Sequence, residues 1–98
     1  MYRGTTPTLY FTMPFDSTGI SQLYITFNQE GKYVLEKTLG DVTYTDKRIE
    51  LKLTQTDTLQ IKSGAIQMQI RVKFEDDSAI ASNIIYTTAK DILKGGEI

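Results

Sequence analysis

Apolar and polar side chains alternate along most of the chain, which is the pattern of β-strands that bury one face. The cleanest case is the 48–53 segment, where Ile49, Leu51 and Leu53 alternate with charged residues. Together the alternating segments predict seven short strands, at residues 8–13, 23–28, 33–38, 42–45, 48–53, 66–74 and 80–87.

The alternation also predicts which face of each strand is buried. In the longest segment, 66–74, Ile70 belongs to the apolar face and Arg71 to the polar face. We therefore expect Ile70→Asp to unfold the domain, because it places an unpaired charge in the core, and Arg71→Ala to be nearly silent.

The same alternation assigns the faces of two other segments. In the 33–38 segment, strict alternation places Tyr33 and Leu35 on the same face. The 80–87 segment is predicted as one continuous strand. One of its faces carries Ile80, Ser82, Ile84 and Tyr86.

The connections are short and polar. Turn-forming residues occur at 29–32, 46–47 and 75–78. Residues 54–59 break the strand pattern, since Thr54 suits a helix N-cap and Asp57, three residues later, completes a loose capping box. We expect one helical turn here, crossing from one sheet to the other.

Short strands joined by polar turns at this spacing predict an all-β fold, an immunoglobulin-like antiparallel two-sheet sandwich of about seven strands. Abundant Thr, Ile and Val suit such strands. The chain lacks the Cys–Trp–Cys signature of antibody domains, because it has neither Cys nor Trp. No linker or repeat divides the 98 residues, so residues 1–98 are predicted to be a single domain.

The amino-acid composition excludes several classes of functional site. Without Cys or His the chain has no disulfide, no thiolate nucleophile, no Cys/His zinc site and no histidine general base. Its net charge is −1, which gives no electrostatic surplus for nucleic acid or anionic lipid. The first residues lack the apolar run of a signal peptide, and we expect none.

The acidic residues do not suggest a site. The densest cluster is Glu75, Asp76 and Asp77, three consecutive acids without the alternate spacing of a calcium loop. A solvated hairpin turn explains them better. Two carboxylates could in principle run a glycosidase, but the chain has no Trp to line a sugar cleft. We therefore expect no enzyme activity, no catalytic residues, no metal site and no cofactor.

Four residues are candidates for a contact surface. If the apolar faces of the first two strands are buried, Tyr10 and Tyr24 point outward on the same side, and exposed tyrosines are common at protein interfaces. Ordinary cross-strand aromatic pairing is the alternative. Arg71 and Lys73 belong to the polar face of the 66–74 segment. They suit either a nucleic-acid surface or, more simply, the solvated face of a sheet.

Three stretches carry a resemblance to a known group of proteins. They are Arg3-Gly4-Thr5-Thr6-Pro7-Thr8, residues 52–59 (KLTQTDTL) and residues 81–85 (ASNII). In this order they resemble small uncharacterised phage and prophage proteins of Gram-positive bacteria. More loosely, they are similar to the immunoglobulin-like N-terminal domain of phage baseplate upper proteins. The resemblance carries no catalytic residues.

The resemblance implies a structural or assembly module of a phage tail or baseplate, in the virion or the host bacterial cytoplasm. Its partners would be proteins, either further copies of itself or a larger phage structural protein, and neither nucleic acid nor membrane. A small carbohydrate- or ligand-binding sandwich stays open as the alternative. A ring of exposed aromatic residues on one concave face, without self-association, would favour that alternative.

Overall fold

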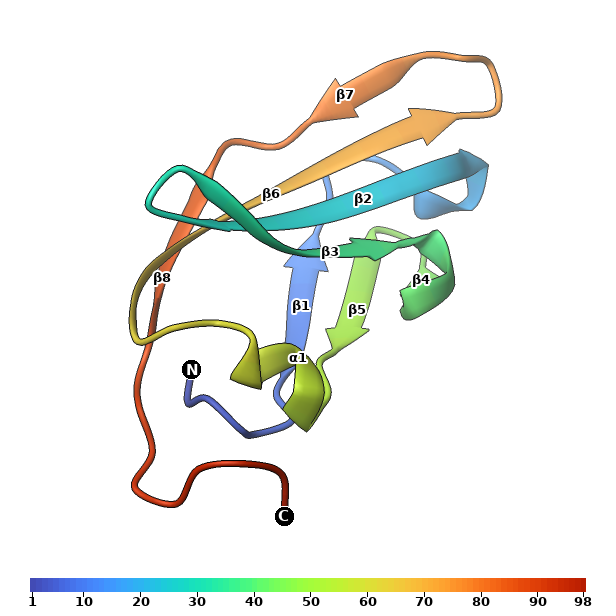
Figure 1. The fold of residues 1–98 in the computed structure, drawn as a ribbon. Helices are drawn as coiled ribbons and strands as arrows, with labels where there is room; N and C mark the ends of the chain where they lie inside the picture. The colour runs from blue at the N-terminus through green and yellow to red at the C-terminus, as the bar shows by residue number, and fades with distance from the viewer.

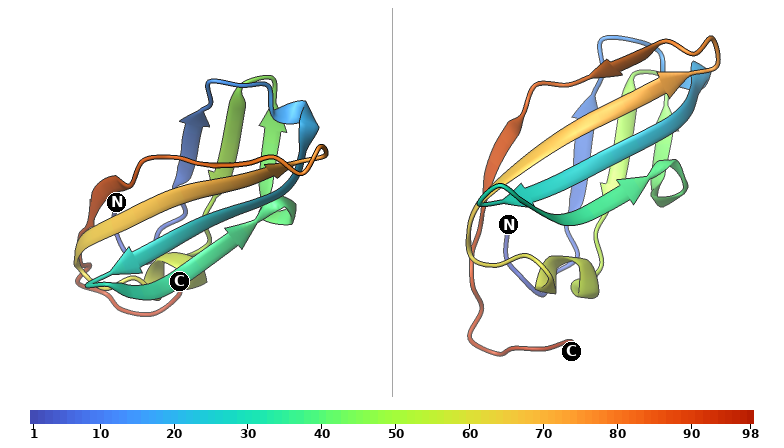
Figure 2. Two further views of the ribbon diagram at one scale, coloured as in Figure 1. Left: turned by 90° about the horizontal axis from the view of Figure 1, so that it is seen from above. Right: turned by 45° about the horizontal axis from the view of Figure 1, so that its top comes forward.

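Two antiparallel sheets pack face to face in the computed structural model, which describes residues 1–98 (Figures 1 and 2). The small sheet has the strand order β1-β5-β4, with bounds Thr8–Thr12, Arg48–Lys52 and Val42–Thr45. The large sheet begins with β3-β2-β6, with bounds Lys32–Thr38, Ile20–Gln29 and Gly64–Phe74. Two further strands, β7 (Ala79–Ala81) and β8 (Ile85–Ala89), both pair with β6. The other elements are α1 (Gln55–Leu59) and the 3-10 turns η1 (Ser17–Gly19) and η2 (Leu39–Asp41).

The strand order matches that of immunoglobulin sandwiches. With β1 in the place of strand B, the small sheet follows the order B-E-D and the large sheet the order C′-C-F-G, where β7 and β8 share the place of G. This confirms the predicted fold class, although the structure has eight strands instead of seven.

The edge of the small sheet differs from that of an immunoglobulin domain. There, strand A lies on the outer edge of strand B, whereas no strand pairs with that edge of β1 here. The residues before β1 follow the large sheet instead. Tyr2 forms a parallel bridge with Lys90, and the Arg3 N–H donates to the Lys90 carbonyl (3.0 Å). The place of strand A is therefore vacant.

The core lies between the two sheets, as the alternation predicts. Ile49 and Leu51 of β5 and Ile25 and Phe27 of β2 are completely buried. In β6, Ile70 is 2% exposed, which confirms its predicted position on the buried face. Burying side chains of this size stabilises the fold by about 1.5–3 kcal/mol each.

Helix α1 forms where the sequence predicts it, with the predicted cap. The Thr54 hydroxyl accepts from the Asp57 N–H (3.1 Å), and one Asp57 carboxylate oxygen accepts from the Thr54 N–H (2.9 Å). The other oxygen pairs with Lys37 Nζ of β3 (2.9 Å), an ion pair mostly shielded from solvent. The helix thus ties the end of β5 to the large sheet.

The contacts of Asp57 also set its acidity. Burial favours the neutral acid and acts to raise the pKa of Asp57. The Thr54 N–H and the Lys37 ammonium favour the carboxylate and outweigh burial, so the pKa of Asp57 lies below its ordinary value. The ionised form is therefore the one that the fold stabilises.

A β-bulge in β3 breaks the strict alternation that the sequence predicts for this strand. Phe27 pairs with Leu35, but the next residue, Asn28, pairs with Tyr33. Val34 is the extra residue, and it places Tyr33 on the opposite face from Leu35. The prediction that the two share a face is wrong for this reason.

The predicted single strand at 80–87 is also wrong, because a second bulge divides it. Arg71 pairs with Ala81 and Met68 with Ile85, so three residues of the returning chain (82–84) oppose two of β6. This shift moves Ile85, instead of Ile84, onto the face that Ile80 occupies. The chain therefore forms two strands, β7 and β8, with a kink between them.

Candidate functional site

The four predicted contact residues do not form one surface. Tyr10 lies in β1 of the small sheet, whereas Tyr24, Arg71 and Lys73 lie in β2 and β6 of the large sheet. Both tyrosine rings point outward, but from opposite layers of the sandwich. The expectation that they face the same side is wrong, because alternation shows which residues point outward but not which sheet a strand joins.

Tyr10 is 57% exposed on the outer face of the small sheet. The guanidinium of Arg48, on the neighbouring strand β5, lies 4.4 Å from the centre of its ring. This distance is within the range of a cation–π contact. Tyr10 is therefore partly covered by its own sheet and is not a free aromatic platform.

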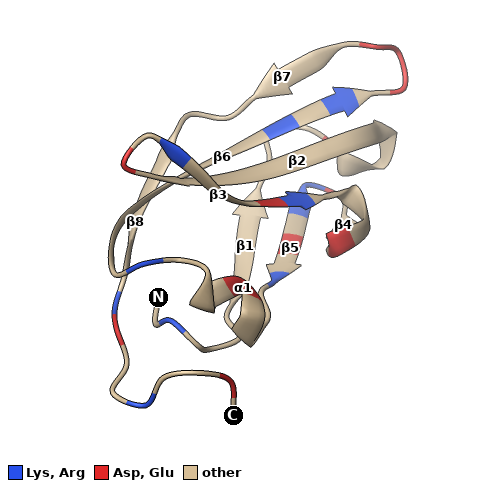
Figure 3. Ribbon diagram, viewed as in Figure 1, with Lys and Arg blue, Asp and Glu red and all other residues tan.

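The large sheet does bring the other three residues together. Tyr24 and Arg71 are directly opposite in the β2–β6 pairing, and Lys73 follows on the same face of β6. They line a hollow of about 190 Å³. Lys73 Nζ pairs with Asp77 (3.2 Å) in the acidic turn after β6, and Figure 3 shows these basic and acidic positions at the same end of the sheet. This end of the sheet therefore carries charges of both signs.

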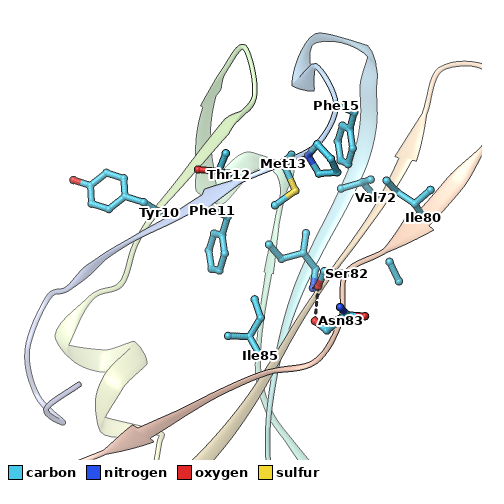
Figure 4. Close-up of a pocket in the computed structure, with 13 residues that line it drawn as sticks. Tyr10, Phe11, Thr12, Met13, Phe15, Val72, Ile80, Ser82, Asn83 and Ile85 are labelled. Carbon is cyan, nitrogen blue, oxygen red and sulfur yellow. Dashed lines mark hydrogen bonds between the residues drawn. The ribbon is translucent and has the colours of Figure 1, made fainter.

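A larger hollow lies on the side of the sandwich where β1 has no neighbour. An apolar groove of about 410 Å³ separates the outer edge of β1 from β7 and β8. Phe11 and Met13 point into it from one wall, and Ile80 and Ile85 line the other (Figure 4). None of its thirteen lining residues is charged. The groove therefore favours an apolar, uncharged occupant.

One polar side chain at the kink of the far wall, that of Ser82, has its hydrogen bonds satisfied within the protein. The Ser82 hydroxyl accepts from the Ile70 N–H (3.0 Å) and donates to the Asn83 carbonyl (2.9 Å), and the Ser82 N–H donates to the Ile70 carbonyl (2.8 Å). This arrangement holds the kink between β7 and β8. It leaves the Ser82 hydroxyl little capacity to bind a polar ligand.

The backbone of β1 supplies the unsatisfied polar groups. Leu9 and Phe11 pair with Leu51 and Ile49 of β5. At one end of β1 the Leu53 N–H donates to the Pro7 carbonyl, and at the other end the Met13 N–H donates to the Lys47 carbonyl. These bonds show that the odd-numbered residues of β1 exchange main-chain hydrogen bonds with β5.

The alternate residues therefore present their main-chain groups on the other side of β1. The N–H and C=O groups of Thr8, Tyr10 and Thr12 point away from β5, and no strand pairs with them. Because they line the same side of the strand as the groove, the groove has an apolar floor and a hydrogen-bonding edge.

The acidic turn has its own internal partners. Asp76 accepts from the Ser78 hydroxyl (2.6 Å) and the Ser78 N–H (3.0 Å), and these bonds lower the pKa of Asp76. The structure brings together no three Asp, Glu, His or Cys side chains in a geometry that could hold a metal ion. No helix has both the length and the apolar character of a membrane span.

The comparison with known proteins adds no identification. No protein-family model, no curated protein and no solved structure matches the chain.

Sequence reasoning missed the groove, although part of its signal is present. Met13-Pro14-Phe15 continues the apolar pattern beyond the end of β1, and Ile84-Ile85 interrupts the alternation. Both stretches contain more apolar residues than one buried strand face accounts for. The meeting of Met13 and Ile85 across a vacant strand position depends on sheet order, which the sequence does not show.

Proposed function

We propose that this domain is a non-catalytic assembly module that binds another protein through the open side of its sandwich. One observation carries the proposal: an uncharged apolar groove runs beside a strand edge whose main-chain groups have no partner. Exposed edges of this kind attract further polypeptide unless they are covered or charged. The β1 edge is neither.

The chemistry of the groove favours polypeptide over sugar. Carbohydrate recognition requires hydrogen-bonding side chains that converge on the ligand, whereas nine of the thirteen residues that line the groove are hydrophobic and the Ser82 hydroxyl is engaged within the protein. Apolar side chains of a partner would instead contact Phe11, Met13 and Ile80. This supports the protein-binding alternative over the carbohydrate-binding one.

The biological setting is proposed from the resemblance alone. A phage or prophage tail or baseplate needs small sandwiches that join larger proteins, and the open edge suits that task. Location in the virion or the host cytoplasm stays a prediction with this setting.

A pair of matched variants tests the proposed function. Ile80 lines the groove and is 43% exposed, and Ile84 is 47% exposed but does not line it. Because both side chains already reach solvent, Ile80→Asp and Ile84→Asp should each fold. Random linear peptides displayed on yeast are selected for binding to the wild-type domain and then tested against both variants.

We expect the selected peptides to lose binding to Ile80→Asp and to keep it with Ile84→Asp, because only the first places a charge in the groove. Failure to enrich any peptide would contradict the proposal. So would selected peptides that bind both variants as well as they bind the wild type.

A further inference from the structure

We propose that the groove takes one extended, uncharged peptide segment of a partner protein, which adds a strand to the outer edge of β1. This inference rests on the proposed function and specifies its partner. The added strand would occupy the vacant place of strand A and turn β5-β1 into the interior of a four-stranded sheet. Main-chain pairing would supply affinity, and the groove would select side chains.

The backbone geometry allows this pairing without rearrangement. Tyr10 and Thr12 present their N–H and C=O groups on the open side, at the two-residue spacing of a β-ladder. The strand is already held straight by its pairing with β5. An incoming segment therefore meets a preformed edge and need order only its own chain.

The lining defines the side chains of the occupant. Alternate residues of an added strand would point inward, toward Ile70, Val72 and Ile80, where no charged group is available to pair with them. A charge at such a position would be desolvated without compensation. The inward residues are therefore apolar, and the outward residues, next to Tyr10 and Arg48, are free to be polar.

A second intact copy does not suit this edge. The large sheet extends beyond β1 through β7 and β8, so the wall opposite the vacant position is already occupied by this chain. If two β1 edges paired, each copy would bring its own large sheet against β7 of the other. The space suits one strand and not a second sandwich.

The test separates backbone pairing from side-chain contact at a single residue. Tyr10→Pro removes the outward N–H of β1 but no bond to β5, and edge strands tolerate Pro where the N–H faces solvent. Tyr10→Thr removes the ring and keeps the N–H. The peptides selected on the wild-type domain are titrated against both variants, after circular dichroism has shown that each is folded.

We expect Tyr10→Thr to bind nearly as well as wild type and Tyr10→Pro to bind about tenfold more weakly or worse, because a main-chain bond is lost. We also expect an Asp in place of an inward apolar residue of the peptide to abolish binding. Equal binding to Tyr10→Pro and Tyr10→Thr would overturn the added-strand proposal. If those peptides still failed to bind Ile80→Asp, the proposed function would stand without it.

If Tyr10→Pro does not fold, protection of main-chain amides in the wild-type domain decides the question. Bound peptide should then slow hydrogen exchange at Tyr10 and Thr12. Protection confined to the β7 and β8 edge, or to neither edge, would overturn the proposal.

Discussion

Two regions of this sandwich differ in whether their polar groups have partners: the α1 corner, which contains Thr54, Asp57 and Lys37, and the outer edge of β1. At the α1 corner, Asp57 accepts from Thr54 and Lys37 at 2.9 Å each, so a nearly buried carboxylate has its partners within the chain. At the β1 edge, the main-chain groups of Tyr10 and Thr12 have none. Both regions border the same core, yet only one is complete by itself.

This difference indicates where the fold is self-sufficient and where it is prepared for a partner. Folded proteins pair nearly all of their buried polar groups, and the α1 corner follows that rule. An unpaired strand edge beside an apolar groove stays tolerable only while water reaches it. A partner strand would remove the water and satisfy the same groups, which is the arrangement we propose.

The largest expected effect concerns β6, the longest strand of the core. Ile70→Asp should destabilise the domain by about 4 kcal/mol or more, because it buries an unpaired charge. The neighbouring outward change, Arg71→Ala, should stay within about 0.5 kcal/mol. Urea unfolding followed by circular dichroism measures both, and a stable Ile70→Asp domain would show that β6 is wrongly oriented.

A second substitution tests how much the ion pair of the α1 corner contributes to stability. Lys37→Met should cost about 2–3 kcal/mol, because it leaves the Asp57 carboxylate shielded and without its cation. The matched change Lys73→Met breaks the exposed pair with Asp77 and should cost less than about 1 kcal/mol. If the two variants lose equal unfolding free energy in urea, the Lys37–Asp57 pair is no better shielded from solvent than the exposed Lys73–Asp77 pair.

A comparison within β1 tests the open edge itself. Leu9→Pro removes an N–H that bonds to β5 and should cost about 3 kcal/mol, whereas Tyr10→Pro should cost clearly less. Thermal unfolding of the two variants gives the difference. Equal destabilisation would contradict the alternation of inward and outward amides on which the groove argument depends.

The smallest expected effect is the pH dependence of the stability that Asp57 contributes at the α1 corner. Because the folded pKa of Asp57 lies below its ordinary value of 3.8, its contribution is fully present above that value. The contribution is lost as the pH falls through the lowered folded pKa. The difference in unfolding free energy between wild type and Asp57→Asn should therefore shrink below about pH 4. A difference that is constant down to pH 2 would show that the carboxylate charge contributes nothing.

Local sequence signals predicted the closed corner far better than the open edge. The capping box of Thr54 and Asp57 lies within four residues, and the apolar face of β6 repeats without interruption. Both can be read from neighbouring residues. The two bulges, at Val34 and at 82–84, depend on how a strand meets its partner, and alternation alone does not show them.

The partner of Asp57 and the vacant strand position were out of reach for the same reason. Lys37 faces α1 because its strand neighbour Ile25 faces the core, and that pairing is a tertiary fact. The separation of Tyr10 from Tyr24 likewise follows from sheet membership. Sequence reasoning therefore found the strands, and the structure was needed to find the groove between them.

Amide hydrogen exchange along β1, resolved by NMR, tests the central claim most directly. In the free domain, the Leu9 and Phe11 amides should exchange slowly and the Tyr10 and Thr12 amides rapidly, because only the first pair bonds to β5. Adding a selected peptide should slow Tyr10 and Thr12. If these two amides are already protected in the free domain, or stay unprotected when the peptide is bound, β1 is not the open edge to which a partner adds its strand.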